Sequence, residues 1–159
     1  MRRLFIAAMM LIPMMAMAEI PGMERLIRQY GDNESVTIVT IDGTTIQMML
    51  GGDESLDGVA SQFEGITVIM TEDEDIASDI HNRIGRMVRR AHMDTLCDIA
   101  EEETHVTIYT LSEGEVTTDI FVSIADDGET GCVAITGEFT AETISDIMSG
   151  SSNLINFSN

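Results

Sequence analysis

The sequence predicts an α+β fold, a two-layer sandwich in which helices pack on one face of a mostly antiparallel sheet. Three observations predict it: a long amphipathic helix pattern at residues 72–93, two strand patterns before it, and four strand patterns after it. The last four are joined by short polar connections, and short connections join antiparallel neighbours because parallel strands need a long crossover. The second half of the chain should therefore form a four-strand meander.

The first 18 residues have the pattern of an export signal. Arg2 and Arg3 precede an almost wholly apolar run, and Ala16-Met17-Ala18 supplies the small residues that a signal peptidase accepts. We expect cleavage before Glu19 and a periplasmic or secreted location. No later run approaches the roughly 20 apolar residues of a spanning helix, so we expect no membrane insertion after cleavage. The chain then divides into a signal peptide (1–18), one α+β domain (19–150) and a loosely ordered tail (151–159).

The first elements of the expected domain are short. Residues 21–30 repeat apolar side chains at helical spacing, and 35–41 is a strand by its β-branched residues. Residues 43–50 are compatible with either a helix or a strand. The stretch 66–70 is a second clear strand.

The pattern at residues 72–93 is the strongest helix signal in the chain. Its apolar residues fall on one arc when each residue turns by about 100°. They are Ile76, Ile80, Ile84, Met87, Val88 and Ala91. Acidic residues crowd its start and two arginines lie near its end, which suits the helix dipole.

The period then changes to two, as in strands, over residues 95–100, 105–111, 116–125 and 130–136. Gly137 interrupts the last strand. Thr140 is a suitable N-cap for a closing helix that includes Ile144, Ile147 and Met148.

Three stretches of these strands resemble a family known as domain of unknown function 4252, a group of small exported bacterial proteins. They are Val36-Thr37-Ile38-Val39-Thr40, Gly65-Ile66-Thr67-Val68-Ile69 and Ile135-Thr136-Gly137-Glu138-Phe139. The resemblance implies a compact α+β domain behind a signal peptide. It implies no activity and no functional residues.

The charge of the chain is strongly negative, with 28 acidic residues and a formal net charge of −20. Removal of Arg2 and Arg3 with the signal changes this to −22 and leaves six arginines and no lysine. Such a charge repels nucleic acid and anionic membranes. Cations or basic partners would be attracted.

The two cysteines, Cys97 and Cys132, fall on the first and last strands of the expected meander. At about 4.8 Å per strand they would lie roughly 14 Å apart. A disulfide needs a much closer approach, so we expect both to be unpaired.

An acidic stretch before the second strand partly fits a calcium loop. Asp53, Ser55, Asp57 and Glu64 occupy positions 1, 3, 5 and 12 of the EF-hand pattern, with Gly58 at position 6. However, Leu56 and Ala60 depart from the pattern, and glycines flank the loop where helices should continue. An acidic surface loop without metal is therefore the expected interpretation, with calcium as the alternative.

Four of the six arginines of the mature chain share one face of the long helix, opposite its apolar arc. They are Arg83, Arg86, Arg89 and Arg90. Guanidinium groups suit carboxylate and phosphate, which makes this face a candidate binding site for an anion or an acidic partner. The alternative, which we expect, is that the four neutralise acidic loops of the protein itself.

No motif of a nucleophilic hydrolase, phosphate loop or zinc site occurs, and we expect no cofactor. The leading functional hypothesis is a non-enzymatic exported domain that binds an unknown protein partner in the periplasm or cell envelope. A calcium-binding module based on Asp53–Glu64 ranks second, and a hydrolase with an unrecognised carboxylate site ranks third.

Overall fold

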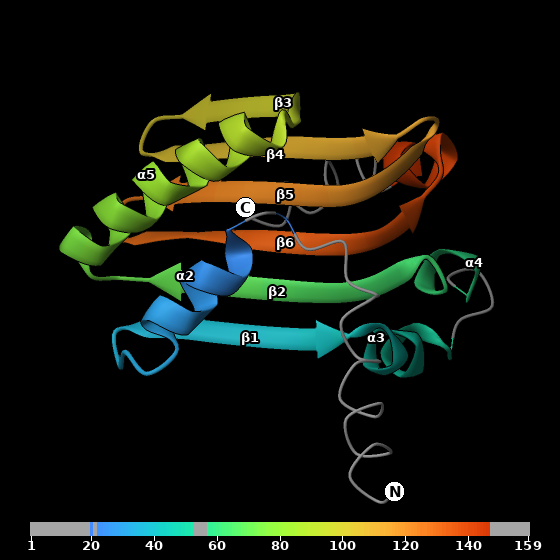
Figure 1. The fold of residues 1–159 in the computed structure, drawn as a ribbon, viewed down its shortest axis with the longest axis horizontal. Helices are drawn as coiled ribbons and strands as arrows, with labels where there is room; N and C mark the ends of the chain where they lie inside the picture. Colours follow the sequence, from blue (N-terminus) through green and yellow to red (C-terminus); the bar gives the residue numbers. More distant parts are fainter. Residues whose placement is uncertain (1–19, 21, 53–56, 147–159) are drawn as a thin grey trace, which may run out of the picture.

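The computed structural model describes residues 20, 22–52 and 57–146 and centres on one six-stranded sheet (Figure 1). The strands lie in the order β1-β2-β6-β5-β4-β3, and every neighbouring pair is antiparallel. Their bounds are β1 Val36–Asp42, β2 Phe63–Thr71, β3 Asp94–Glu101, β4 Thr104–Glu113, β5 Val116–Asp126 and β6 Glu129–Phe139. The α+β class and the meander from β3 to β6 are confirmed.

The helix α5 (Glu74–Ala91) carries the chain across the sheet from β2 to β3. Its 18 residues span about 27 Å, while β2 and β3 are four strand spacings apart, about 19 Å. It therefore runs diagonally over β6, β5 and β4 (Figure 1). The Asp73 carboxylate accepts hydrogen bonds from the amides of Asp75 and Ile76, and His92 ends the helix in the left-handed conformation.

The shorter helices follow local capping signals. α2 spans Met23–Tyr30, α3 spans Gly43–Leu50 and α4 spans Asp57–Ala60. The ambiguous segment at 43–50 is thus helical, because the Asp42 carboxylate accepts a hydrogen bond from the Thr45 amide and caps it. A closing helix occupies 141–146, where the Thr143 amide donates to Thr140 Oγ1. Ile147, Met148, the tail and the predicted signal lie outside the described residues.

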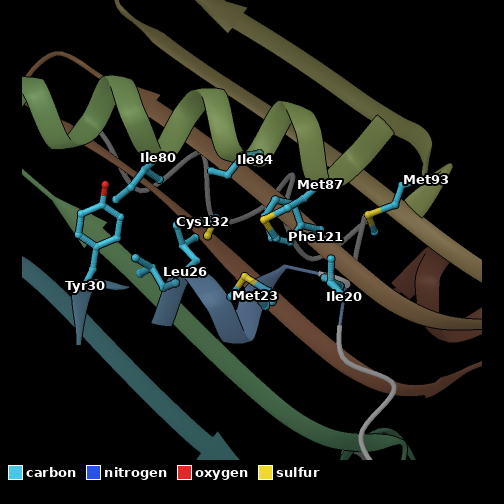
Figure 2. Packing of buried hydrophobic residues seen from close by; sticks show 12 residues of the cluster. Ile20, Met23, Leu26, Tyr30, Ile80, Ile84, Met87, Met93, Phe121 and Cys132 are labelled. Atoms are coloured by element: carbon cyan, nitrogen blue, oxygen red, sulfur yellow. The ribbon is translucent and has the colours of Figure 1, made fainter. Parts of the chain in front are cut away.

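Helices α2 and α5 pack side by side on one face of the sheet, which we call the helix face (Figure 1). The helices supply most of the large apolar side chains, and the sheet contributes Phe121 and Cys132 (Figure 2). Ile69 and Ala134 of the sheet belong to the same core. The helical members of this core include Met23, Leu26, Ile80, Ile84 and Met87. None of the described helices is long and apolar enough to cross a membrane.

The opposite face of the sheet carries three adjacent rows rich in valine and isoleucine, and we call these three rows the Val/Ile face. Residues directly opposite one another on paired strands share a face, so the register defines its rows. The central row is Val39, Val68, Val133, Val122, Ile108 and Cys97. The flanking rows add Met70, Ile124, Val106 and Ile99 on one side and Ile41, Ile66, Ile135 and Ile120 on the other.

Both cysteines are free thiols, as predicted. Cys97 lies on β3 and Cys132 on β6, with β4 and β5 between them. They also point to opposite faces of the sheet, because Cys132 belongs to the core of the helix face and Cys97 to the Val/Ile face.

Candidate functional site

A groove of about 450 Å³ lies between α2 and α5, and arginines form much of its wall. We call it the arginine groove. It is lined by Gly22, Arg25, Leu26, Arg83, Arg86, Met87 and Arg90. Three of the four arginines singled out in the sequence are therefore brought together here, and Arg25 of α2 joins them from the other wall.

The turn of α5 explains which arginines reach the groove. Arg83, Arg86 and Arg90 are three and four residues apart, so they form one stripe on the side of the helix next to α2. Arg89 is turned about 100° away from Arg90 and does not line the groove. The stripe borders the apolar arc instead of lying opposite to it, which corrects the geometry expected from the sequence.

Gly22 allows the two helices to approach closely at the end of the groove. A Cβ at this position would lie 2.8 Å from Met87 Cγ. The residue also has φ of 105°, in the left-handed region that favours glycine. A larger residue here would displace the Met87 side chain and strain the backbone.

Asp79 joins α2 to α5 beside the groove. Its Oδ2 accepts hydrogen bonds from the Tyr30 hydroxyl and from Arg83 Nε, the latter at 2.7 Å. These two bonds, first that of Tyr30, lower the pKa of the Asp79 carboxyl below its ordinary value. Burial and the same carboxylate raise the pKa of Tyr30. The Arg83 charge is therefore largely committed to a structural contact.

The other arginines of the groove have no such partner. Within the part of the chain that the structure describes, the salt bridges are Arg28–Glu24, Arg83–Asp79 and His105–Asp98. Arg25, Arg86 and Arg90 thus have no carboxylate within salt-bridge distance among those residues, and neither does Arg89. Arg83 has one, but Asp79 lies on its own helix and not in an acidic loop. Three guanidinium groups consequently line the groove without a salt bridge to any described residue, although the Arg86 charge helps to lower the pKa of Asp79.

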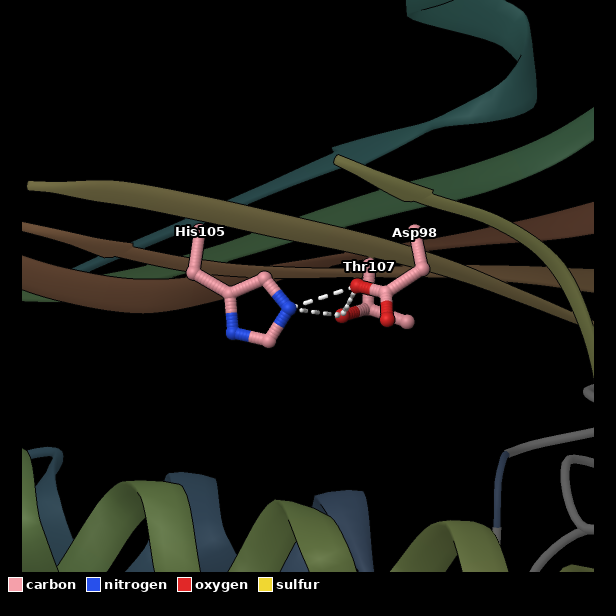
Figure 3. A network of polar contacts seen from close by, with 3 residues as sticks. All are labelled: Asp98, His105 and Thr107. Atoms are coloured by element: carbon pink, nitrogen blue, oxygen red, sulfur yellow. Dashed lines mark hydrogen bonds and ion pairs between the residues drawn. The ribbon is translucent and has the colours of Figure 1, made fainter. Parts of the chain in front are cut away.

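A second polar cluster lies on β3 and β4, on the same side of the sheet as the helices (Figure 3). His105 Nε2 is 2.5 Å from Asp98 Oδ1, and the Thr107 hydroxyl donates to the same oxygen at 3.1 Å. The contact with His105 is the main cause that lowers the pKa of Asp98. In a Ser-His-Asp relay the acid and the hydroxyl bind different ring nitrogens. Here both lie near Nε2, so the cluster is a cross-strand contact and not a relay geometry.

The residues of the alternative calcium loop are only partly described. Asp53 and Ser55 lie outside the described residues, Asp57 is the first residue of α4, and Glu64 is exposed on β2. Among the described residues, no three His, Cys, Asp or Glu side chains are grouped so that they could hold a metal ion. Calcium binding stays a sequence-based hypothesis.

The family model for a domain of unknown function (DUF4252) matches residues 30–147. The chain belongs to the DUF4252 family. The match spans all six strands and α5, which confirms the resemblance carried by β1, β2 and β6. A search of curated proteins gave no match.

Within this DUF4252 protein, the groove draws on residues both inside and outside the matched region. Arg83, Arg86 and Arg90 lie inside it, whereas Arg25 precedes it. Sequence reasoning missed Arg25 because the amphipathic pattern of 21–30 identifies a polar face but not the element beside it. The Asp98, His105 and Thr107 cluster was missed for a similar reason, since only the β3–β4 register brings the three together.

Proposed function

We propose that this protein is an exported, non-enzymatic binding protein that holds an anionic ligand in the arginine groove. The observation that carries the proposal is the unpaired state of Arg25, Arg86 and Arg90 within the described chain, whose sequence has a net charge of −20. In so acidic a chain, three cations in one groove that form no salt bridge among the described residues favour a ligand that supplies anionic partners.

The spacing of the cations indicates a ligand with more than one anionic group. Arg86 and Arg90 form a row about 6 Å long on α5, and Arg25 lies on the facing wall. A single small anion would engage only part of this row. We therefore propose a ligand with clustered carboxylate or phosphate groups, presented by a partner in the periplasm or cell envelope.

The test is a calorimetric titration of the chain from Glu19 to Asn159 with two probes, tripolyphosphate and a hexaglutamate peptide. The variant is Arg86→Gln with Arg90→Gln. The matched control is Arg28→Gln with Arg89→Gln, which removes the same charge but spares the groove. Charge-assisted hydrogen bonds contribute about 1.5–3 kcal/mol each, so we expect the groove variant to lose at least about tenfold in affinity.

The control should lose less than about threefold in affinity, because long-range charge effects are screened beyond about 10 Å at about 0.1 M salt. Whichever probe binds more tightly identifies the chemistry of the anionic groups. Equal losses in the two variants would assign the effect to net charge alone. Failure of both probes to bind the unaltered protein would contradict the proposal.

A further inference from the structure

The Val/Ile face is a wide, mostly apolar surface in a very acidic protein, and the next row of the sheet on this side carries Glu101, Asp126 and Glu129. Its three rows contain 14 apolar side chains, and Asp94, at the edge of the sheet, is the one acidic residue in register with them. Helices α2 and α5 both pack on the other side. At one end Ile120 and Phe139 are buried, but the remaining valines and isoleucines are partly exposed, and Val39 is 44% exposed.

A continuous apolar surface of this kind marks an interaction site, because soluble proteins rarely leave one uncovered. The six strands are about 24 Å from edge to edge, and the three rows extend about 20 Å along them. The outline is therefore at most about 500 Å² on one copy, because Ile120 at one end is already buried within the chain. Two copies would together bury at most about 1,000 Å², the size of a weak, reversible interface.

We propose that a second copy of this chain packs on the Val/Ile face, so that two sheets form a face-to-face sandwich. Two twisted sheets pack face to face with their strands crossed by about 30°, and the central row of valines then meets its own copy across a two-fold axis. Charge also favours this face. Two copies of this acidic chain repel each other, and a contact centred on these rows brings together side chains that carry no charge.

The dimer leaves the arginine groove free. The groove lies between α2 and α5 on the helix face, so the two grooves of a dimer open on opposite outer sides. This inference is therefore independent of the proposed anionic ligand. Either can fail without the other.

The test is sedimentation equilibrium of the chain from Glu19 to Asn159 over a range of concentrations. We expect a reversible dimer that strengthens as salt is raised, because salt screens the repulsion between two acidic copies. Val133→Lys, at the centre of the face, should weaken dimerisation at least tenfold. The matched control Thr95→Lys places the same charge on the helix-face side of β3 and should leave dimerisation unchanged.

A second variant, Val39→Lys, tests the same face if Val133→Lys does not fold. Val39 is 44% exposed on an edge strand, so a lysine there should be tolerated by the single chain. Circular dichroism verifies that each variant is folded. A monomer at every concentration would overturn the proposal and would indicate that another part of the chain or another molecule covers the face. A dimer that persists unchanged in both folded lysine variants would also overturn it.

Discussion

The two faces of the sheet differ in how much apolar surface the strands themselves contribute. The helix face contributes a few apolar residues beneath α2 and α5 and becomes polar toward β3, where Asp98, His105 and Thr107 lie (Figure 3). The Val/Ile face is apolar from β1 to β3. The face covered by helices therefore carries less apolar surface of its own than the opposite face.

The source of the apolar surface accounts for this difference. On the helix face the helices supply most of the large apolar side chains, although the sheet adds Ile69 and Phe121. Small residues of the sheet, Cys132 and Ala134, lie in the same core. On the Val/Ile face the sheet itself supplies the apolar surface. An alternating strand pattern therefore does not identify the face on which the helices lie.

The largest expected effect compares adjacent residues of β2 on the two faces. Ile69→Ala should reduce the free energy of unfolding by about 3 kcal/mol, because Ile69 is fully buried and its loss leaves a cavity. Val68→Ala should cost about 1 kcal/mol or less at a concentration where the protein is monomeric. Urea unfolding measures both changes. Equal losses in the free energy of unfolding would show that Val68 is as well packed in the single chain as Ile69.

A smaller effect is expected from Asp119, a buried carboxyl on β5 that shares the side of the sheet occupied by α5. Thr118 donates a hydrogen bond to Oδ2, but Oδ1 has no partner among the described residues. Burial raises the pKa of Asp119, and Glu113 and Glu64 raise it further. The folded state thus favours the protonated carboxyl, and stability is lost as the pH rises through the raised pKa.

Asp119→Asn should therefore increase stability by about 1–2 kcal/mol at about pH 7. The gain should disappear at a pH below the ordinary carboxyl pKa of 3.8, because the protonated Asp119 carboxyl is then neutral, as is the asparagine that replaces it. Thermal unfolding at the two pH values measures it. A loss of stability at neutral pH would show that the Asp119 charge has a partner in the folded protein.

The smallest effect concerns the contact that holds α2 against α5 on the helix face. The pKa of Asp79 is lowered in the folded state, so ionised Asp79 stabilises the fold. This stabilisation is complete above the ordinary carboxyl pKa and is lost as the pH falls through the lowered value. Because its side chain is 39% exposed, Asp79→Asn should cost at most about 1 kcal/mol at neutral pH and nothing in acid. Asp127→Asn, in an exposed turn, is the control for thermal unfolding. A loss that did not change with pH would exclude the ionised carboxylate as its cause.

The sequence by itself determined the local elements. Helix α5 follows from its apolar spacing and acidic start, and the closing helix follows from Thr140. The first strand follows from its β-branched residues, and the last four follow from their period of two. These patterns depend only on residues that are close together in the sequence, so they can be recognised without the tertiary structure. At residues 43–50 the periodicity was ambiguous, and the structure resolved it through the cap at Asp42.

Only the tertiary structure decided which elements became neighbours. The pairing of β6 with β2 joins segments about 65 residues apart, and no short-range pattern specifies it. The same holds for Arg25 opposite Arg86 across the groove, and for the contact of Tyr30 with Asp79. Helical periodicity places side chains on a face of their own helix, but the element against which that face packs depends on how the whole chain buries its apolar surface.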